Sequence, residues 1–232
     1  MKTAGVIGGL GPDTTSKFYL QVIEKAKSVD SKNRPPLLIW NVPMNLDEES
    51  AFIEGGDRRD YYLELLTEGV QKLQAGGADF IVIPCNSVHV FIEDLRKIAQ
   101  IPVLSIVEET AQFLEDHDIK QVGLLATSAT TNSQLYHQPL ERKDVSITTP
   151  NQQSQQKLNQ SITRLVNHEQ SPQDTAVLNT IISDLADSGV QTTLLACTDL
   201  QLAAPSHPTV AIYDTMHILV DSTVREIFSD KS

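Results

Sequence analysis

The chain has 232 residues and a formal net charge of -12 at pH 7, from 18 basic and 30 acidic side chains. This balance, without any basic stripe, argues against nucleic acid as a partner, because binding to phosphates needs clustered Lys and Arg. Hydrophobic residues make up 40% of the chain and charged residues 21%, as in globular proteins. No apolar run approaches the ~20 residues that a membrane span needs, so no membrane partner is expected.

Residues 1–9 lack the apolar core of a signal peptide, which indicates a cytoplasmic protein whose thiols stay reduced. A length of 232 residues is near the upper limit for one hydrophobic core and favours two smaller ones.

Short apolar runs alternate with segments of helical period along the whole chain. The expected strands are 4–8, 37–41, 80–84, 103–106, 122–126, 145–148, 193–196 and 210–212. The expected helices are 14–29, 57–75, 87–98, 106–117, 131–140, 152–168, 172–188 and 215–228. This order predicts an α/β protein with mostly parallel sheets that carry helices on both faces.

The two cysteines of the chain have the same local setting. Cys85 follows Gly77, and Cys197 follows Gly189, by eight positions; each ends an apolar strand and precedes small polar residues. Ligands of open parallel sheets bind beyond the carboxyl ends of the strands. The matched pair therefore predicts two acid/base groups that face one site from two halves of the molecule.

Further similarities support two related lobes. The runs 5–9 and 123–127 each open a half with a strand and a small-residue loop, and 102–110 parallels 208–215. We expect an N-terminal lobe of residues 1–101 plus 210–232, with the last helix returning to it, and a C-terminal lobe of residues 102–209. The lobes should be related by a pseudo-twofold axis, with the active site in the cleft between them.

Three motifs resemble those of the aspartate/glutamate racemase superfamily, and of its aspartate racemase branch in particular. They are Gly8-Gly9-Leu10-Gly11-Pro12, Pro84-Cys85-Asn86-Ser87-Val88-His89 and Ala196-Cys197-Thr198-Asp199, and the likeness runs essentially end to end. The resemblance implies a racemase that needs neither pyridoxal phosphate nor metal and acts on a small amino acid, aspartate or glutamate by default. It also implies a homodimer, as relatives commonly are.

In such a racemase one cysteine removes the α-proton as a thiolate, and the other delivers a proton to the opposite face as a thiol. A free thiol has a pKa of ~8.5, so one member of a pair can be ionised near neutral pH. A helix that begins just after each cysteine would favour its thiolate. His89, four residues after Cys85, is expected either to support that thiolate or to cap or pack.

The substrate carboxylate needs hydrogen-bond donors. Backbone N–H groups after the cysteines are the candidates, and the resemblance adds two side chains of the pocket and two glycines that let substrate approach the backbone. The expected binding residues are Gly9, Gly11, Asn86, Ser87, Thr130 and Thr198, with Thr127 and Asp199 as further candidates.

Two departures from the family pattern concern specificity. Members that act on aspartate commonly carry an arginine where this chain has Glu48 and Glu49, and a lysine where it has Asn167. A buried substrate carboxylate without a basic partner is costly. Three arginines are candidate replacements, Arg58, Arg59 and Arg164. Alternatively, Glu48 or Glu49 selects a neutral or basic amino acid.

Other readings of these residues remain open. Cys85 and Cys197 can form a disulfide on oxidation, whereas metal binding lacks ligand spacing. The glycine loop lacks the third glycine of a dinucleotide fingerprint. Two other functions fit the same fold: a carboxylate isomerase or decarboxylase, and a non-catalytic amino-acid-binding protein.

Overall fold

The computed structural model describes residues 1–53 and 58–229. Its elements alternate between strands and helices, and all strand pairs are parallel, which confirms the predicted α/β fold with parallel sheets. The chain divides into two compact units. The first unit comprises Met1–Asn45, Arg58–Glu109 and Met216–Ser232, and the second comprises Leu46–Asp57 and Thr110–Thr215.

The sheet of the first unit has three strands in the order β2-β1-β3. They are β1 (Ala4–Gly8), β2 (Leu37–Asn41) and β3 (Phe80–Val82). All five residues of β1 are buried, as expected of a central parallel strand that is covered on both faces. The C-terminal ends of β1 and β3 therefore meet at one edge of the sheet, where the glycine loop and Cys85 follow.

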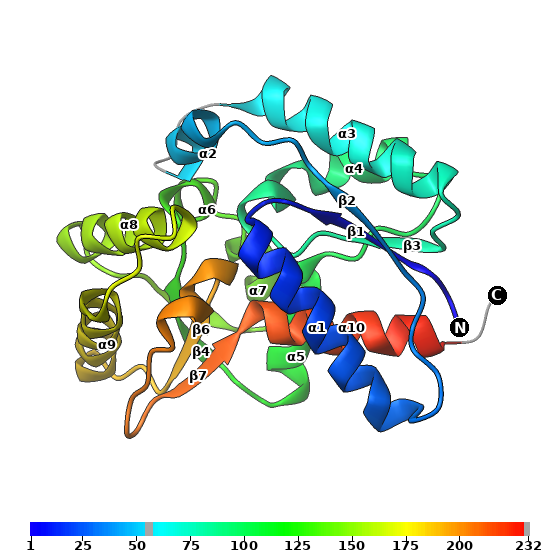
Figure 1. The fold of residues 1–232 in the computed structure, drawn as a ribbon. Coiled ribbons are helices and arrows are strands. Elements are labelled where there is room, and N and C mark those ends of the chain that lie inside the picture. Colours follow the sequence, from blue (N-terminus) through cyan, green and yellow to red (C-terminus); the bar gives the residue numbers. More distant parts are fainter. Residues whose placement is uncertain (54–57, 230–232) are drawn as a thin grey trace. The chain divides into compact units, whose positions relative to one another are not determined.

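Helices cover both faces of this sheet (Figure 1). On one face lies α3 (Arg59–Ala75), and on the other lie α1 (Pro12–Val29) and α10 (Thr215–Phe228). The peptide N–H of Lys2 donates to the carbonyl of Ile227 over 2.7 Å and so joins the start of the chain to α10. The short helix α4 (Ile92–Ile98) packs beside α3.

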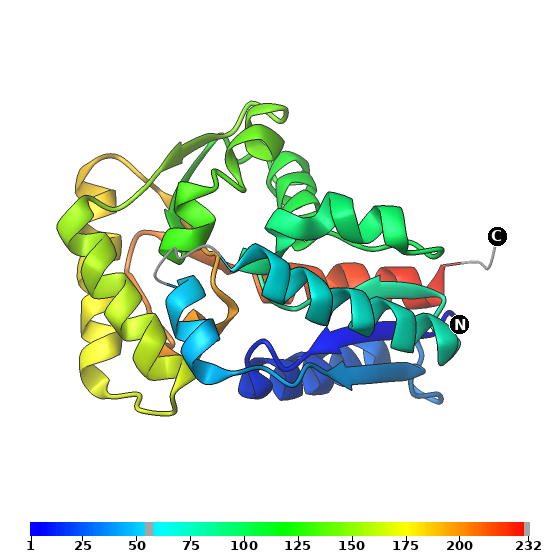
Figure 2. The same cartoon turned by 90° about the horizontal axis from the view of Figure 1, so that it is seen from above.

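The sheet of the second unit has four strands in the order β5-β4-β6-β7. They are β4 (Gln121–Leu125), β5 (Ser146–Thr148), β6 (Thr192–Leu195) and β7 (Ala211–Asp214). The helices α8 (Gln152–Val166) and α9 (Pro172–Asp187) pack against each other beside it (Figure 2). Their apolar faces and the sheet form one buried cluster that includes Leu158, Ile182 and Leu195.

The second unit also contains the short helices α2 (Leu46–Ile53), α6 (Ser128–Asn132) and α7 (His137–Glu141). The sequence analysis left 46–53 outside any element, but this segment is helical and packs on α6 and α8. It therefore groups with the second unit, although it lies within the range 1–101. Likewise β7 pairs with β6 along its whole length, so residues 211–214 belong to the second sheet.

Some predicted elements differ in detail. The expected strand 103–106 reduces to a single bridge between Ile81 and Val103, because α5 (Ile106–Asp116) begins directly after it. The expected helix 131–140 is divided into α6 and α7 by the turn at Gln134, whose φ is +54°. Within the part of the chain that the structure describes, no helix is both long and apolar enough to cross a membrane.

Candidate active site

The glycine loop after β1 is held by a short hydrogen-bond chain. The N–H of Gly9 donates to Oγ1 of Thr15 over 2.9 Å, and the Thr15 hydroxyl donates to the carbonyl of Gly11 over 3.0 Å. Gly9 has a φ of +86°, and a Cβ there would stand 2.8 Å from the backbone nitrogen of Val42. Glycine is required at this position because the backbone itself turns and packs closely.

Cys85 follows β3 in the first unit and is a half-buried free thiol. Its N–H donates to the carbonyl of Ile83 over 2.8 Å. The next two residues, Asn86 and Ser87, are buried polar residues, and the 3-10 helix η1 (Ser87–Phe91) begins there. The expected helix after Cys85 is thus present, but its first turn is a 3-10 turn and α4 continues it.

Both ring nitrogens of His89 form hydrogen bonds with backbone groups. Its Nδ1 lies 2.8 Å from the carbonyl oxygen of Cys85, and its Nε2 accepts the N–H of Ile106 over 3.2 Å. The Cys85 carbonyl can only accept, so Nδ1 carries the hydrogen and the ring is neutral. Burial lowers the His89 pKa to about 4, although its contact with the Cys85 carbonyl acts in the opposite direction. His89 therefore caps α5 and anchors the Cys85 backbone.

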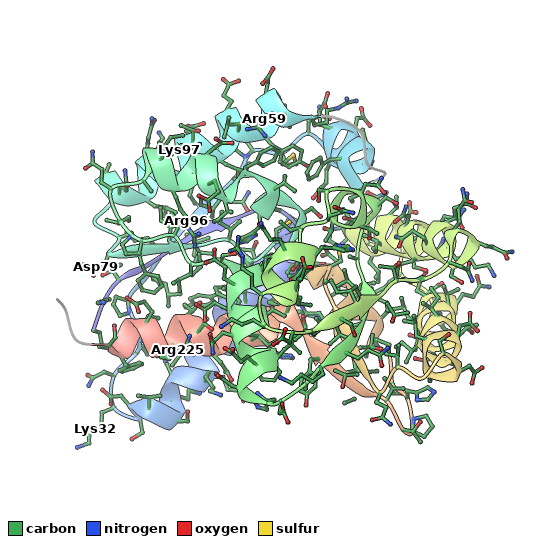
Figure 3. The ribbon with its side chains drawn as sticks, turned by 180° about the vertical axis from the view of Figure 1, so that it is seen from behind. Lys32, Arg59, Asp79, Arg96, Lys97 and Arg225 are labelled. Carbon is green, nitrogen blue, oxygen red and sulfur yellow. The ribbon has the colours of Figure 1, made fainter. Side chains whose placement is uncertain are left out.

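Arg96 reinforces the same region from α4 (Figure 3). Its guanidinium donates to both carboxylate oxygens of Glu108 over 2.7 Å each, and to the carbonyl of Val103 over 3.1 Å. This forked pair joins α4 to the first turn of α5 with fixed geometry. Hydrogen bonds from the His89 and Arg96 side chains to backbone groups of the first unit thus stabilise the region around Cys85.

Cys197 occupies the matching position in the second unit. It follows β6, is 7% exposed, and is the N-cap residue of the 3-10 helix η2 (Thr198–Ala203). Its Sγ lies 3.9 Å from Oδ2 of Asp199 in donor geometry, and the cysteine is a free thiol. Thr198 and Asp199 are both buried. The Cys197 thiol therefore lies within hydrogen-bonding reach of a buried carboxyl group.

Glu49 adds a second carboxyl to the surroundings of Cys197. It projects from α2, is 9% exposed, and lies near Asp199. Burial and the negative charge of Asp199 raise the pKa of Glu49 to about 7. Glu48, on the same helix, is half-buried. Of the two glutamates named from the sequence, Glu49 is the one that the fold buries in this cluster.

Thr127 and Thr130 shape the loop after β4. Thr127 is the N-cap of α6, where its Oγ1 accepts the Thr130 N–H and donates to the Thr130 Oγ1, each over 3.2 Å. Gln155 of α8 reaches the same loop, because its Nε2 donates to the carbonyl of Ala126 over 2.9 Å. The sequence analysis did not name Gln155; only its place on the polar start of α8 could have indicated it.

The basic residues named as replacements for the missing family arginine and lysine have other partners. Arg164 pairs with the buried Asp174 within the second unit. Arg59 pairs with Asp94 and lies 5.5 Å from the ring centre of Phe91 (Figure 3). Arg164 and Arg59 are therefore engaged in structural ion pairs.

The remaining candidates are Arg58 and Asn167. Arg58 is half-buried at the N-cap of α3, and Asn167 is exposed at the C-cap of α8.

The expected site residues are thus divided between the two units. The first unit contains Cys85 with Gly9, Gly11, Asn86 and Ser87, and the second unit contains Cys197 with Thr198, Asp199 and Glu49. Thr127 and Thr130 belong to the second unit as well. Across residues 1–53 and 58–229, no three His, Cys, Asp or Glu side chains are placed to hold a metal ion.

Comparison with known proteins identifies the family. Residues 7–223 match the family described as Asp/Glu/Hydantoin racemase. The chain is 28% identical to the broad specificity amino-acid racemase RacX of Bacillus subtilis (strain 168) over 228 residues, which cover 95% of this chain and 96% of RacX. This chain belongs to the Asp/Glu/Hydantoin racemase family.

Solved structures share the fold. An aspartate racemase homologue from Pyrococcus horikoshii OT3 superposes with a TM-score of 0.80 at 22% identity, covering 99% of this chain and 100% of that one. The aspartate racemase of Picrophilus torridus superposes with a TM-score of 0.78 at 23% identity, covering 100% of this chain and 96% of that one.

Proposed function

We propose that this protein is an amino-acid racemase that works without pyridoxal phosphate, with Cys85 and Cys197 as its two acid/base groups. One observation carries the proposal. In a chain of the racemase family, the only two cysteines are free thiols at matching positions, each after a parallel strand and beside the start of a 3-10 helix. Aspartate or glutamate is the default substrate class, and the relative named for broad specificity supports testing a wide panel.

The reaction needs one proton transfer on each face of the α-carbon. A thiolate takes the α-hydrogen, so the C–H bond breaks and an S–H bond forms, leaving the electron pair on the substrate as a carbanion. The other thiol then gives up its proton, and a new C–H bond forms on the opposite face. The enzyme ends with the protonation states of its thiols exchanged, and the reverse reaction restores them.

Carbanion formation places charge on the substrate carboxylate. The backbone N–H groups of Asn86, Ser87 and Thr198 are the proposed donors, since all three residues are buried next to a cysteine. A hydrogen-bond donor that is already positioned for the developing oxyanion charge lowers the activation free energy by roughly 2.7–4 kcal/mol. These donors belong to the backbone, so side-chain substitutions at the three positions should affect binding less than the cysteine substitutions affect turnover.

Racemisation in heavy water tests the proposal. Single enantiomers of each amino acid are incubated with the purified protein and no added cofactor, and α-deuteration and inversion are followed by NMR and chiral chromatography. Inversion with one deuterium from solvent is expected. Cys85→Ala and Cys197→Ala should each abolish inversion, while α-exchange of one enantiomer persists.

Three results would contradict it. Both single variants could racemise at the parental rate, which would exclude the two-thiol mechanism. The protein could release carbon dioxide or isomerise an unsaturated diacid instead, as the other enzymes considered for this fold do. It could also bind amino acids without exchanging the α-hydrogen, as a binding protein would.

A further inference from the structure

Two amide side chains of α8 hold the loop that follows β4. Nε2 of Gln155 donates to the carbonyl of Ala126 over 2.9 Å and to Oδ1 of Asn159 over 3.0 Å. Nδ2 of Asn159 in turn donates to Oγ of Ser128 over 2.7 Å. An amide nitrogen has two N–H donors, so that of Gln155 serves both of its partners. The network therefore reaches the residue before Thr127 and the residue after it.

These side chains take over where sheet pairing stops. The pairing of β4 with β5 ends at Gly123 and Thr148, so that ladder does not reach Ala126, which is buried. A buried carbonyl needs a hydrogen-bond donor, and Gln155 supplies it. Helix α8 begins soon after β5 ends, which places its first turn beside the carboxyl end of the sheet. The loop is thus fixed by side chains of α8 at this edge.

The held loop leaves the sheet beside Cys197. Strands β4 and β6 are parallel, with Leu125 opposite Leu195, and the N–H of Ala196 donates to the Leu125 carbonyl over 2.7 Å. Parallel strands leave a sheet in the same direction, so Thr127 and Cys197, which follow the paired residues at equal distance in the sequence, emerge side by side. Helix α8 also packs against η2, which begins directly after Cys197. One helix therefore supports both segments.

Helix α8 is a firm support because its opposite face lies in the core of the second unit. Leu158 and Ile162 are buried in the hydrophobic cluster of that unit. Gln155 and Asn159 are half-buried and stand four residues apart, so they lie on the same face of the helix. The packing of α8 against the core thus determines where the two amides, and the loop bonded to them, are placed.

We propose that Gln155 and Asn159 are positioning residues of this enzyme. They fix the loop that carries Thr127 and Thr130, so that a substrate bound beside Cys197 meets the sulfur in reactive geometry. The inference rests on the proposed racemase function and adds two residues to its site. Both act through the loop and need not touch the substrate. Misplacing reacting groups by about 1 Å can lower a rate roughly 100-fold, which sets the size of the expected effect.

Apolar variants of similar shape remove the network. Gln155→Met and Asn159→Leu should each lower kcat/KM for racemisation about 10- to 100-fold. Asn159→Asp should lower it less, because its carboxylate still accepts from Gln155 and the Ser128 hydroxyl can donate to it. The matched control is Gln156→Met, at an exposed position of the same helix, which should leave kcat/KM within about twofold of the wild type.

An isotope effect separates positioning from a loss of folded protein. Wild type and Gln155→Met are compared on the α-deuterated L and D enantiomers of the amino acid that racemises fastest. If proton transfer at Cys197 has become slow, the isotope effect on kcat/KM should rise for the enantiomer whose hydrogen Cys197 removes. It should fall for the other enantiomer, because Cys197 then acts as the donor after the labelled bond has broken. A smaller amount of active protein changes neither isotope effect.

The position of the loop can also be measured without turnover. Cys197 is 7% exposed, so its alkylation by iodoacetamide should be slow in the wild type. Loss of one hydrogen bond to the loop in Gln155→Met should speed alkylation of Cys197 about five- to tenfold. Cys85, in the first unit, is the internal control, and its alkylation rate should stay unchanged. Mass spectrometry of the two cysteine peptides gives both rates.

The outcomes separate this inference from the function on which it rests. Faster alkylation of Cys197 alone, with isotope effects that move in opposite directions, supports it. Alkylation that is unchanged, or faster at both cysteines, overturns it, because the loop beside Cys197 is then not what the network holds. Unchanged isotope effects also overturn it, since the network is then structural only. A wild type that racemises no amino acid overturns the proposed reaction together with this role, whereas racemisation that is equal in the wild type and the variants overturns the role alone.

Discussion

Acidification should unfold this protein through His89. The ring donates to the Cys85 carbonyl and accepts from the Ile106 N–H, so it can hold its place only when neutral. Its folded-state pKa is about 4, against 6.5 for an exposed histidine. That difference of about 2.5 pKa units corresponds to about 3 kcal/mol of stability.

The sign follows from the protons bound. Between pH 6.5 and pH 4 the unfolded chain carries a proton on His89 and the folded chain does not. The contribution is therefore fully present above pH 6.5 and is lost as the pH falls toward 4.

Urea unfolding of the wild type and His89→Gln at pH 7.5 and pH 4.5 measures this term. At pH 7.5 the variant should be less stable than the wild type by roughly 1–3 kcal/mol, because it leaves a buried backbone partner of the ring unsatisfied. The variant also lacks the ring that titrates in the wild type. The gap should close or reverse at pH 4.5. Carboxylates titrate in both proteins and cancel in the comparison. His117→Gln, at an exposed position in the turn after α5, is the control for loss of a surface ring.

A stability difference between wild type and His89→Gln that is the same at both pH values would refute the reasoning. The ring would then not be held neutral by the fold. Inversion assays on the same variant at pH 7.5 add a functional readout, because loosening the Cys85 carbonyl should lower kcat more than it changes KM.

Two further perturbations follow from the structure. Glu49→Gln should stabilise the protein at pH 8 by up to about 3 kcal/mol and have no effect near pH 4. The pKa of Glu49 is raised to about 7, which means that folding penalises the ionised carboxyl. Equal stabilities of wild type and variant at pH 8 would contradict the burial of this charge. Gly9→Ala should lower the free energy of unfolding in urea by at least roughly 1–3 kcal/mol. The φ of Gly9 is +86°, and the backbone nitrogen of Val42 would stand 2.8 Å from an added Cβ, which leaves no room for it. An unchanged free energy of unfolding would show that the loop relaxes freely.

The buried strands and long helices could be predicted from the sequence because their signals are local. The bounds of β1 and β2 agree with the predicted runs, since each is a short, mostly apolar segment with a glycine or proline close to its ends. Helix α2 was missed because its eight residues include three acids and its position depends on packing against α6 and α8. The local sequence pattern cannot indicate a helix that is stabilised by tertiary packing.

The candidate site was predictable only in part for the same reason. Cys85, Cys197 and their polar neighbours stand in recognisable motifs, but the partners of the charged candidates do not. The sequence made Arg164 a candidate for binding a substrate carboxylate, but Asp174, at the start of the next helix, forms an ion pair with it. Glu49 and Asp199 are separated by most of the chain, so their proximity depends on where α2 packs.

The contact between Cys197 and Asp199 has a consequence for the enzyme at rest. Under the proposed two-thiol mechanism, a carboxylate that accepts from the Cys197 sulfur keeps the hydrogen there, so we expect Cys197 to begin as the proton donor and Cys85 as the base. An enzyme prepared this way is asymmetric before it meets any ligand. In a first turnover too fast for proton exchange with solvent, it should accept one mirror image of the amino acid ahead of the other.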